Sequence, residues 1–193
     1  MQRLTMADVT PLDEYRERRP KWRQRLIEVR ATRRVAVGDR LSVNFENRDT
    51  LLYQVEEMVY AEQMQDRDQV QGELDAYNDL LPGSGELSAT LFIEIPNQAF
   101  IKEELRRFVG IEDAVALEFP DGTRVPGEPA EHRSLAESTA SVHYLRFRLG
   151  DAGTRAFLGG RGHVAVVVDH PNYRRRAVLT DAAWESLAAD LQS

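Results

Sequence analysis

The chain has 193 residues, 42% of them hydrophobic and 30% charged, and carries a formal net charge of -7 with no cysteine. Such a composition is typical of a globular protein with a buried core. The lack of cysteine excludes disulfides, thiolate nucleophiles and cysteine-ligated zinc or iron–sulfur sites within this chain. The longest apolar run, residues 164–168, is far shorter than the roughly 20 residues that cross a membrane, and residues 1–10 lack a secretory pattern. We therefore expect a cytoplasmic protein that contacts no membrane.

The first half of the chain is predicted to be largely helical. Thr10 is placed as the N-cap of a short helix with Pro11 at its first position, and Pro20 is expected to interrupt it. The Gly38-Asp39 pair is typical of a tight turn between two strands. In chain order, the expected elements are the short helix after Thr10, a helix at 21–33, a hairpin of strands at 35–37 and 41–45, and helices at 49–65 and 68–81.

The second half is predicted to form most of a sheet. Apolar and polar residues alternate through 87–95, Asp121-Gly122 is typical of a hairpin turn, and the continuously apolar 163–169 is expected near the middle of the sheet. The expected elements are strands at 87–95, 114–119, 123–125, 142–149, 163–169 and 176–180, helices at 98–109, 151–158 and 182–191, and a loop at 126–137.

These elements predict an α+β fold in which a mostly antiparallel sheet, or a mixed one, carries an inserted helical hairpin and flanking helices. We expect residues 1–193 to form a single domain. Its parts are a helical N-terminal arm at 10–34, the helical hairpin at 48–81, a sheet-forming remainder at 87–180 and a C-terminal helix at 182–191.

Charge is distributed in blocks along the first half of the chain. Residues 16–34 hold nine arginines and lysines against two glutamates, whereas residues 46–79 hold ten acids against two arginines. A basic helix can bind nucleic acid or an acidic partner, but the net negative charge and the lack of a nucleic-acid motif favour a basic helix packed near an acidic hairpin, or a solvated face.

The helix expected at 49–65 has apolar residues on two sides. One side follows Leu51, and a second stripe consists of Tyr53, Glu57, Tyr60 and Met64. Two interpretations fit this stripe. The helix could be wedged between the sheet and its own hairpin partner, or the stripe could be a partner interface for another chain, such as a redox protein or a second copy in a homodimer.

Four polar residues at positions where periodicity predicts burial suggest a metal site. They are Glu62, Glu73, His143 and His170, and such carboxylates and imidazoles suit a divalent metal such as zinc, iron or manganese. Glu62 projects about 20° from Leu51 on a helical wheel. The alternative is a structural polar network in which Arg146 or Arg148 pairs the acids and each histidine bonds to backbone.

Several segments spread over most of the chain resemble an uncharacterised bacterial family catalogued as domain of unknown function 3501. They are residues 34–38 (RVAVG), 53–58 (YQVEEM), 73–78 (ELDAYN), 89–94 (ATLFIE), 141–147 (SVHYLRF) and 169–171 (DHP). The resemblance implies no activity. It implies a context in bacterial redox or oxidative-stress metabolism, beside rubrerythrin-like and iron–sulfur oxidoreductase proteins.

Two functional hypotheses follow from the sequence. The favoured one is a non-catalytic accessory or binding protein that serves a neighbouring redox system, because no catalytic motif is found. The other is a small metal-dependent or ligand-binding enzyme whose pocket lies between the acidic helical hairpin and the sheet. The chain is not itself a rubrerythrin-type di-iron protein, since neither Glu62 nor Glu73 has a histidine three residues later.

Overall fold

The structure is a computed structural model that describes residues 1–132, 134–135 and 137–192. The helices are α1 (Leu12–Ala31), α2 (Arg48–Ala61), α3 (Arg67–Asn78), α4 (Ile101–Arg107), α5 (Gly150–Leu158) and α6 (Asp181–Gln192). The strands are β1 (Arg34–Val37), β2 (Leu41–Glu46), β3 (Glu86–Ile93), β4 (Val115–Glu118), β5 (Arg124–Pro129), β6 (Val142–Arg148), β7 (Ala165–His170) and β8 (Tyr173–Val178). Short 3-10 turns cover Gln98–Phe100 and Ile111–Asp113.

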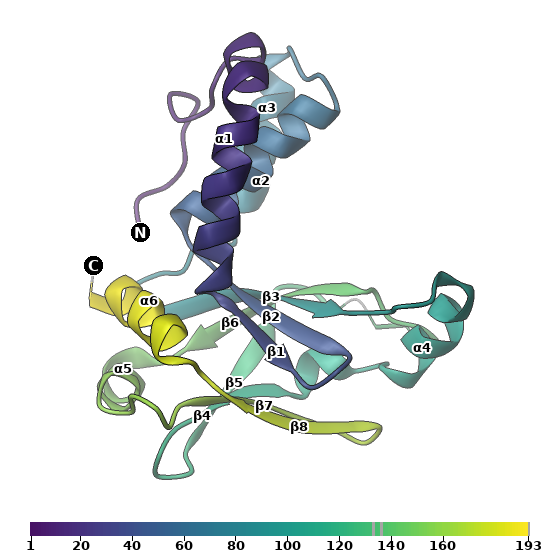
Figure 1. Cartoon of the computed structure of the whole chain (residues 1–193), viewed down its shortest axis with the longest axis vertical. Helices are drawn as coiled ribbons and strands as arrows, with labels where there is room; N and C mark the ends of the chain where they lie inside the picture. The colour runs from purple at the N-terminus through teal and green to yellow at the C-terminus, as the bar shows by residue number, and fades with distance from the viewer. Residues whose placement is uncertain (133, 136, 193) are drawn as a thin grey trace.

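The strands form one sheet in the order β1-β2-β3-β6-β5-β4-β7-β8, and every neighbouring pair is antiparallel. The sheet curls into a nearly closed barrel (Figure 1). Tyr173 of β8 bridges its two edges, because its hydroxyl donates to the carbonyl of Val37 at 2.7 Å and accepts from the amide of Arg40 at 3.2 Å. The α+β fold with an antiparallel sheet is therefore confirmed.

The turn between β1 and β2 requires glycine. Gly38 has a φ of 77°, in the left-handed region, and a Cβ at this position would lie 2.3 Å from the hydroxyl oxygen of Tyr173. The predicted hairpin is confirmed, and the same glycine makes room for the tyrosine that bridges the edges of the barrel.

Two separate apolar cores hold the molecule together. The larger fills the barrel with the inward residues of the strands and with side chains of α5 and α6, whereas a smaller one joins α2 and α3 to the segment before α1. We call α1, α2 and α3 with residues 1–11 the helical unit. It stands on one end of the barrel (Figure 1). In the part of the chain that the structure describes, no helix is long and apolar enough to cross a membrane.

The structure corrects three predictions, which concern Pro20, Thr10 and residues 126–129. Pro20 lies inside α1 and does not end it, and Thr10 caps no helix but donates its hydroxyl to Glu56 at 2.6 Å. Proline has no amide hydrogen to donate. Pro20 lies on the exposed side of α1, where the helix can tolerate the missing hydrogen bond. Residues 126–129 are also not a loop, because β5 continues through them and passes from β4 to β6, where Gly127 packs against Phe147.

A buried arginine joins the helical unit to the barrel. Arg33, only 2% exposed, lies between α1 and β1 and donates to the carbonyls of Phe45 at 2.9 Å and Glu46 at 3.2 Å. It also donates to Ser186 and Asp190 of α6. Burial raises the pKa of Asp190 more than the guanidinium of Arg33 lowers it. These bonds fix the base of α1 against the barrel.

Candidate functional site

The four residues predicted to bind a metal do not converge. Glu62 is exposed at the C-terminal cap of α2 and Glu73 is half-buried on α3, whereas His143 and His170 are buried in the barrel. Among the described residues, no group of three or more histidines and acids could hold a metal ion. The helical wheel predicted Glu62 to be buried beside Leu51, but α2 ends at Ala61, so Glu62 does not continue the helix and is exposed.

Both buried histidines bond to backbone. The Nε2 of His143 lies 2.9 Å from the carbonyl oxygen of Ala140, and the Nε2 of His170 lies 2.9 Å from that of Val109. This is the arrangement that the structural interpretation of the histidines predicted. Arg146 and Arg148 do pair with acids, but their partners are Glu86 and Glu128 and not the two predicted glutamates.

Sequence reasoning missed a fully buried carboxylate, Glu112, beside His143. It accepts from the amide of Ser134 at 2.8 Å and from its hydroxyl at 2.7 Å, and its Oε2 lies 3.8 Å from Nδ1 of His143. Burial acts to raise the pKa of Glu112, but the bonds from Ser134 and the nearby histidine outweigh it, so the pKa is lowered. The Ser134 hydroxyl contacts Glu112 and Thr139 and not the imidazole, so this cluster holds Ser134 in place and is no hydrolytic triad.

The stripe predicted as a partner interface contacts α1 of the same chain. Arg19 binds Glu57 through two bonds of 2.7 and 2.8 Å, and the hydroxyl of Tyr15 donates to the same carboxylate at 2.8 Å. The guanidinium of Arg19 also lies over the ring of Tyr60, at 4.8 Å from its centroid. The fourth residue of the stripe, Met64, packs against the smaller core. The element that covers the stripe is therefore α1, and not the sheet.

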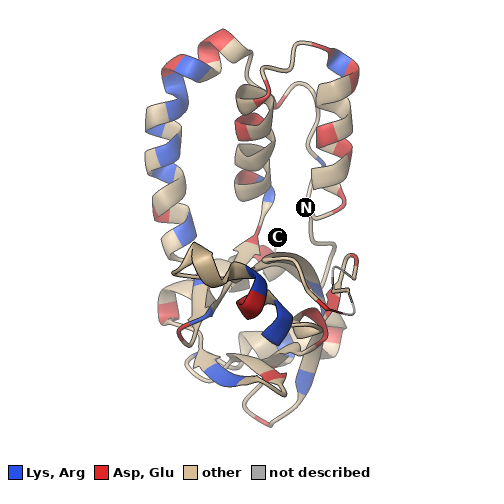
Figure 2. Cartoon of the chain, turned by 90° about the vertical axis from the view of Figure 1, so that its right-hand side faces the viewer, with Lys and Arg blue, Asp and Glu red and all other residues tan. Residues whose placement is uncertain are grey.

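Charge explains why α1 lies against α2. Basic side chains follow α1, whereas acidic ones lie on α2 and α3 (Figure 2). Besides Arg19, Arg18 pairs with the buried Glu56 at 3.2 Å. The hydrogen bond from Arg19 and a further bond from Tyr15 lower the pKa of Glu57 against the opposing effect of burial. Burial and the bond to Glu57 raise the pKa of Tyr15, so this phenol stays protonated.

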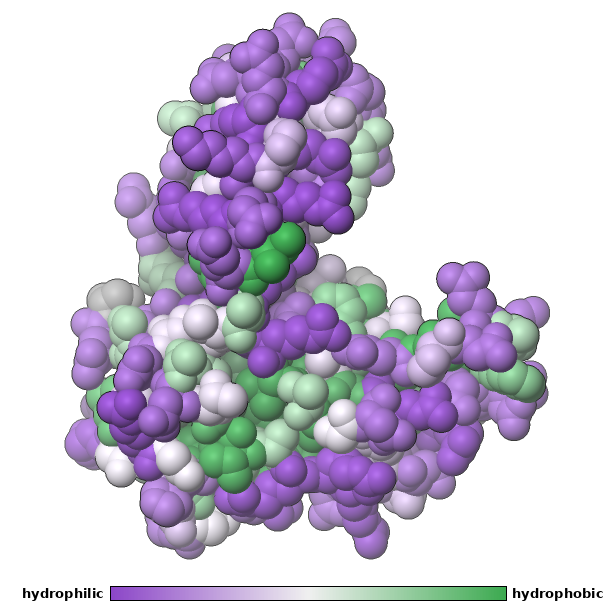
Figure 3. Space-filling model, in the orientation of Figure 1, coloured by the Kyte–Doolittle hydropathy of each residue, from purple (hydrophilic) through white to green (hydrophobic). Residues whose placement is uncertain are grey.

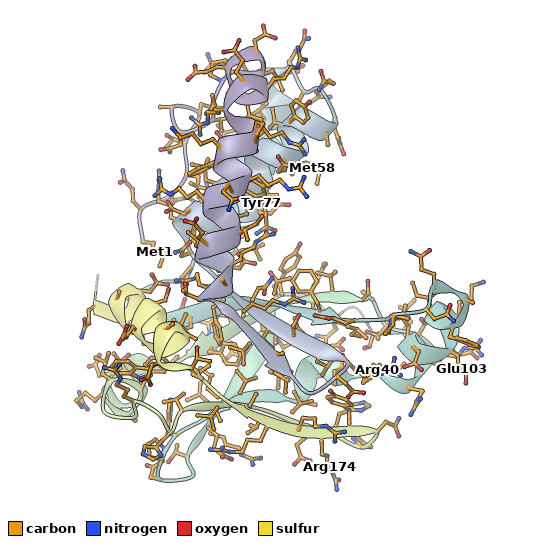
Figure 4. The ribbon with its side chains drawn as sticks, viewed as in Figure 1. Met1, Arg40, Met58, Tyr77, Glu103 and Arg174 are labelled. Atoms are coloured by element: carbon orange, nitrogen blue, oxygen red, sulfur yellow. The ribbon has the colours of Figure 1, made fainter. Side chains whose placement is uncertain are left out.

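Farther along the two helices, beside these ion pairs, lies a hollow of about 630 Å³, which we call the α1/α2 groove. From α1 it is lined by Arg19, Arg23, Leu26, Ile27 and Arg30. From α2 and α3 it is lined by Tyr53, Gln54, Glu57, Met58, Ala61 and Tyr77. Figure 4 labels Met58 of α2 and Tyr77 of α3, two of the residues that line the groove. The groove thus combines basic, aromatic and apolar walls.

Two groove arginines have no carboxylate partner. In the described part of the chain, Arg16, Arg18, Arg19 and Arg25 of α1 each lie within 4.0 Å of an acid, whereas Arg23 and Arg30 do not. Arg30 instead lies over the ring of Tyr53, 5.7 Å from its centroid. Arg19 makes the direct contacts with Glu57, the one glutamate of the groove, and Arg23 acts on Glu57 only through its charge. Three arginines and one glutamate line the groove, so the groove keeps a net positive charge.

The groove also contains an exposed apolar side chain and a half-buried phenol. Ile27 of α1 is 55% exposed, although the helical unit is otherwise mostly hydrophilic on the face that Figure 3 shows, apart from an apolar patch near its base. Burial, together with Tyr144 and two acids, raises the pKa of Tyr77 to about 12. Tyr77 therefore remains a hydrogen-bond donor at neutral pH.

A second hollow lies between the helical hairpin and the sheet, where the enzyme hypothesis placed a pocket. It has a volume of about 440 Å³ and includes Tyr77, Asp79 and Tyr144 in its wall. None of the four residues predicted as metal ligands lines it. The hollow is present at the expected place without the ligands that the hypothesis required.

Comparison with known proteins agrees with the resemblance seen in the sequence. The chain is similar to a protein of unknown function from Burkholderia pseudomallei whose crystal structure is known, with 36% identity, a TM-score of 0.90, and coverage of 98% of this chain and 100% of that one. No curated protein matches the chain. The family model described as protein of unknown function DUF3501 matches residues 3–191. The chain therefore belongs to the DUF3501 family.

Proposed function

We propose that the protein is a non-catalytic binding protein and that it holds a negatively charged group of its ligand in the α1/α2 groove. The observation that carries this proposal is the pair Arg23 and Arg30, which line one concave surface without an acidic partner within 4.0 Å among the described residues. A guanidinium presents several donors in a planar fork and binds carboxylates well. Arg30 is half-buried, so its attraction for an anion is less screened than on an open surface.

The accessory role expected from the sequence fits this proposal. The resemblance to the family implies a place in bacterial redox or oxidative-stress metabolism, so rubrerythrin-like and iron–sulfur oxidoreductase proteins are the first systems in which to seek the ligand. The competing metal-dependent enzyme is supported less, since its four ligands lie on separate parts of the molecule.

A titration with hexaglutamate tests the proposal. This peptide carries the carboxylates that the groove should bind, and amide resonances of the isotope-labelled protein report where it lies. We expect shifts to concentrate at residues 23–30 and 53–61 and to disappear in the Arg23→Gln/Arg30→Gln variant. Shifts spread over the barrel, or unchanged in this variant, would reject the groove as the site.

Lys21→Gln provides the matched control. Lys21 lies on the same helix, carries the same charge and has no acid within 4.0 Å in the described structure, but it does not line the groove. The control should bind hexaglutamate nearly as well as the wild type. Lys21→Gln removes one charge and the groove variant removes two, so a loss of binding free energy in Lys21→Gln of half that in the groove variant or more would mean that the peptide responds only to the total charge of α1.

A further inference from the structure

We infer that the ligand of the α1/α2 groove is an acidic amphipathic helix of a partner protein. This inference rests on the proposed function and adds the form of the ligand to it. Three properties of the groove support it: the spacing of the residues on its walls, its length, and the alternation of basic and apolar side chains along it.

The groove walls have the spacing of helix-packing seams. On α1, Arg19, Arg23, Leu26 and Arg30 follow one another at intervals of four, three and four residues, and on α2, Gln54, Met58 and Ala61 do so at intervals of four and three. Side chains three and four residues apart form the ridges along which a neighbouring helix packs. Two such seams facing one hollow form a cradle for a third helix.

The length of the groove sets the size of the helix. From Arg19 to Arg30 the α1 wall rises about 16 Å at roughly 1.5 Å per residue, which corresponds to about three turns. The ion pair between Arg19 and Glu57 closes one end. A helix of about 11 residues would therefore fill the groove, whereas a single small carboxylate would occupy only a part of it.

The chemistry of the walls specifies the pattern on the partner helix. Arg23 and Arg30 are seven residues apart, about two turns, so they would pair with acids that are also about two turns apart. Between these arginines, Ile27 offers an apolar surface that is 55% exposed, and Met58 lies on the opposite wall. The partner helix should therefore carry apolar residues between its two acids, on the same face.

Peptides of one composition and two sequences test this pattern. The first is a helix of about 14 residues with glutamates seven apart and leucines at intervals of three and four between them, and the second is its scrambled form. We expect calorimetry with the full chain to give binding of the patterned peptide about tenfold tighter, because only this peptide can bury an apolar face against Ile27 and Met58. Ile27→Glu should remove that advantage.

Val178→Glu is the matched control for this variant. Val178 is exposed to a similar degree, 43%, but lies on β8, far from the groove lining, so its replacement should leave binding of the patterned peptide unchanged. The proposal requires the neutral variant Ile27→Gln to weaken the patterned peptide while leaving hexaglutamate, which has no apolar side chain, bound to within about twofold.

Each contrary result has a distinct meaning. Equal binding of the patterned and scrambled peptides, with hexaglutamate still bound, would overturn the helical ligand and leave the charged groove in place. Absence of binding by all three peptides would reject the proposed function as well. If the free chain sediments as a dimer and Ile27→Glu dissociates this dimer, a second copy of the chain occupies the groove. That result would overturn the inference of a separate partner.

Discussion

The barrel and the helical unit use charged side chains in different ways. Where α1 meets the barrel, Arg33 is almost completely buried and directs its nitrogens to two carbonyls, a serine and an aspartate. In the helical unit, Arg23 and Arg30 line a hollow without such partners. The difference fits a stabilising role for the buried charge of Arg33 and the binding role that we propose for the charge of the groove.

Removal of Arg33 should give the largest effect. Arg33→Ala would leave Asp190 and two buried carbonyls without their guanidinium, and breaking such an arrangement costs about 3–5 kcal/mol of unfolding free energy. Urea denaturation measures the loss. Arg34→Ala is the control, because the neighbouring Arg34 is exposed and pairs at the surface with Glu94, so it should cost less than about 1 kcal/mol. Similar losses in both variants would contradict the role of Arg33 as the joint.

Gly38→Ala should destabilise the barrel by a smaller amount. A non-glycine residue at a positive φ costs about 1–2 kcal/mol, and the added Cβ would also collide with the hydroxyl of Tyr173. Gly122→Ala is a suitable control, since Gly122 has a φ of 83° but a Cβ there would meet no atom within 4 Å. A cost at Gly38 no greater than at Gly122 would contradict the tight bridge between β1 and β8.

The Glu112 cluster should make stability depend on pH. The pKa of Glu112 is lowered in the folded protein, so its stabilising contribution is complete above the ordinary value of 4.5 and is lost as the pH falls through the lower folded value. Glu112→Gln should cost about 1–3 kcal/mol at neutral pH and less in acid. A cost that stays constant between neutral and acidic pH would show that the carboxylate charge is not what makes Glu112 stabilising.

Local patterns predicted the elements of the barrel better than the contacts of the helical unit. The turn at Gly38-Asp39 was predicted correctly because it needs a backbone conformation that only glycine adopts easily. The alternation of inward and outward residues along the strand also predicted correctly that His143 is buried. The predictions that Pro20 interrupts a helix and that Pro126 begins a loop were wrong. The missing amide of a proline disrupts a helix or strand only where a neighbouring acceptor needs that hydrogen bond, and the sequence does not show those neighbours.

The candidate site could be anticipated only in part. Periodicity identified Tyr53, Glu57 and Tyr60 as a second packing face of α2, and charge blocks indicated a basic helix near acidic ones. In the structure, α1 covers this face near Glu57 but leaves a groove beside Arg23. This arrangement depends on how the helices pack in three dimensions, which the periodicity of the sequence does not specify. The metal prediction failed for the same reason, because burial of separate residues does not bring them together.

The most direct test of the account compares hexaglutamate binding by the wild type, Arg23→Gln/Arg30→Gln and Lys21→Gln. These exposed or half-buried side chains make no ion pair within 4.0 Å in the described structure, so all three proteins should unfold at nearly the same urea concentration. The account predicts that only the groove variant loses binding, by about tenfold or more, and that added salt weakens the wild type toward it. Undiminished binding by the groove variant would contradict it.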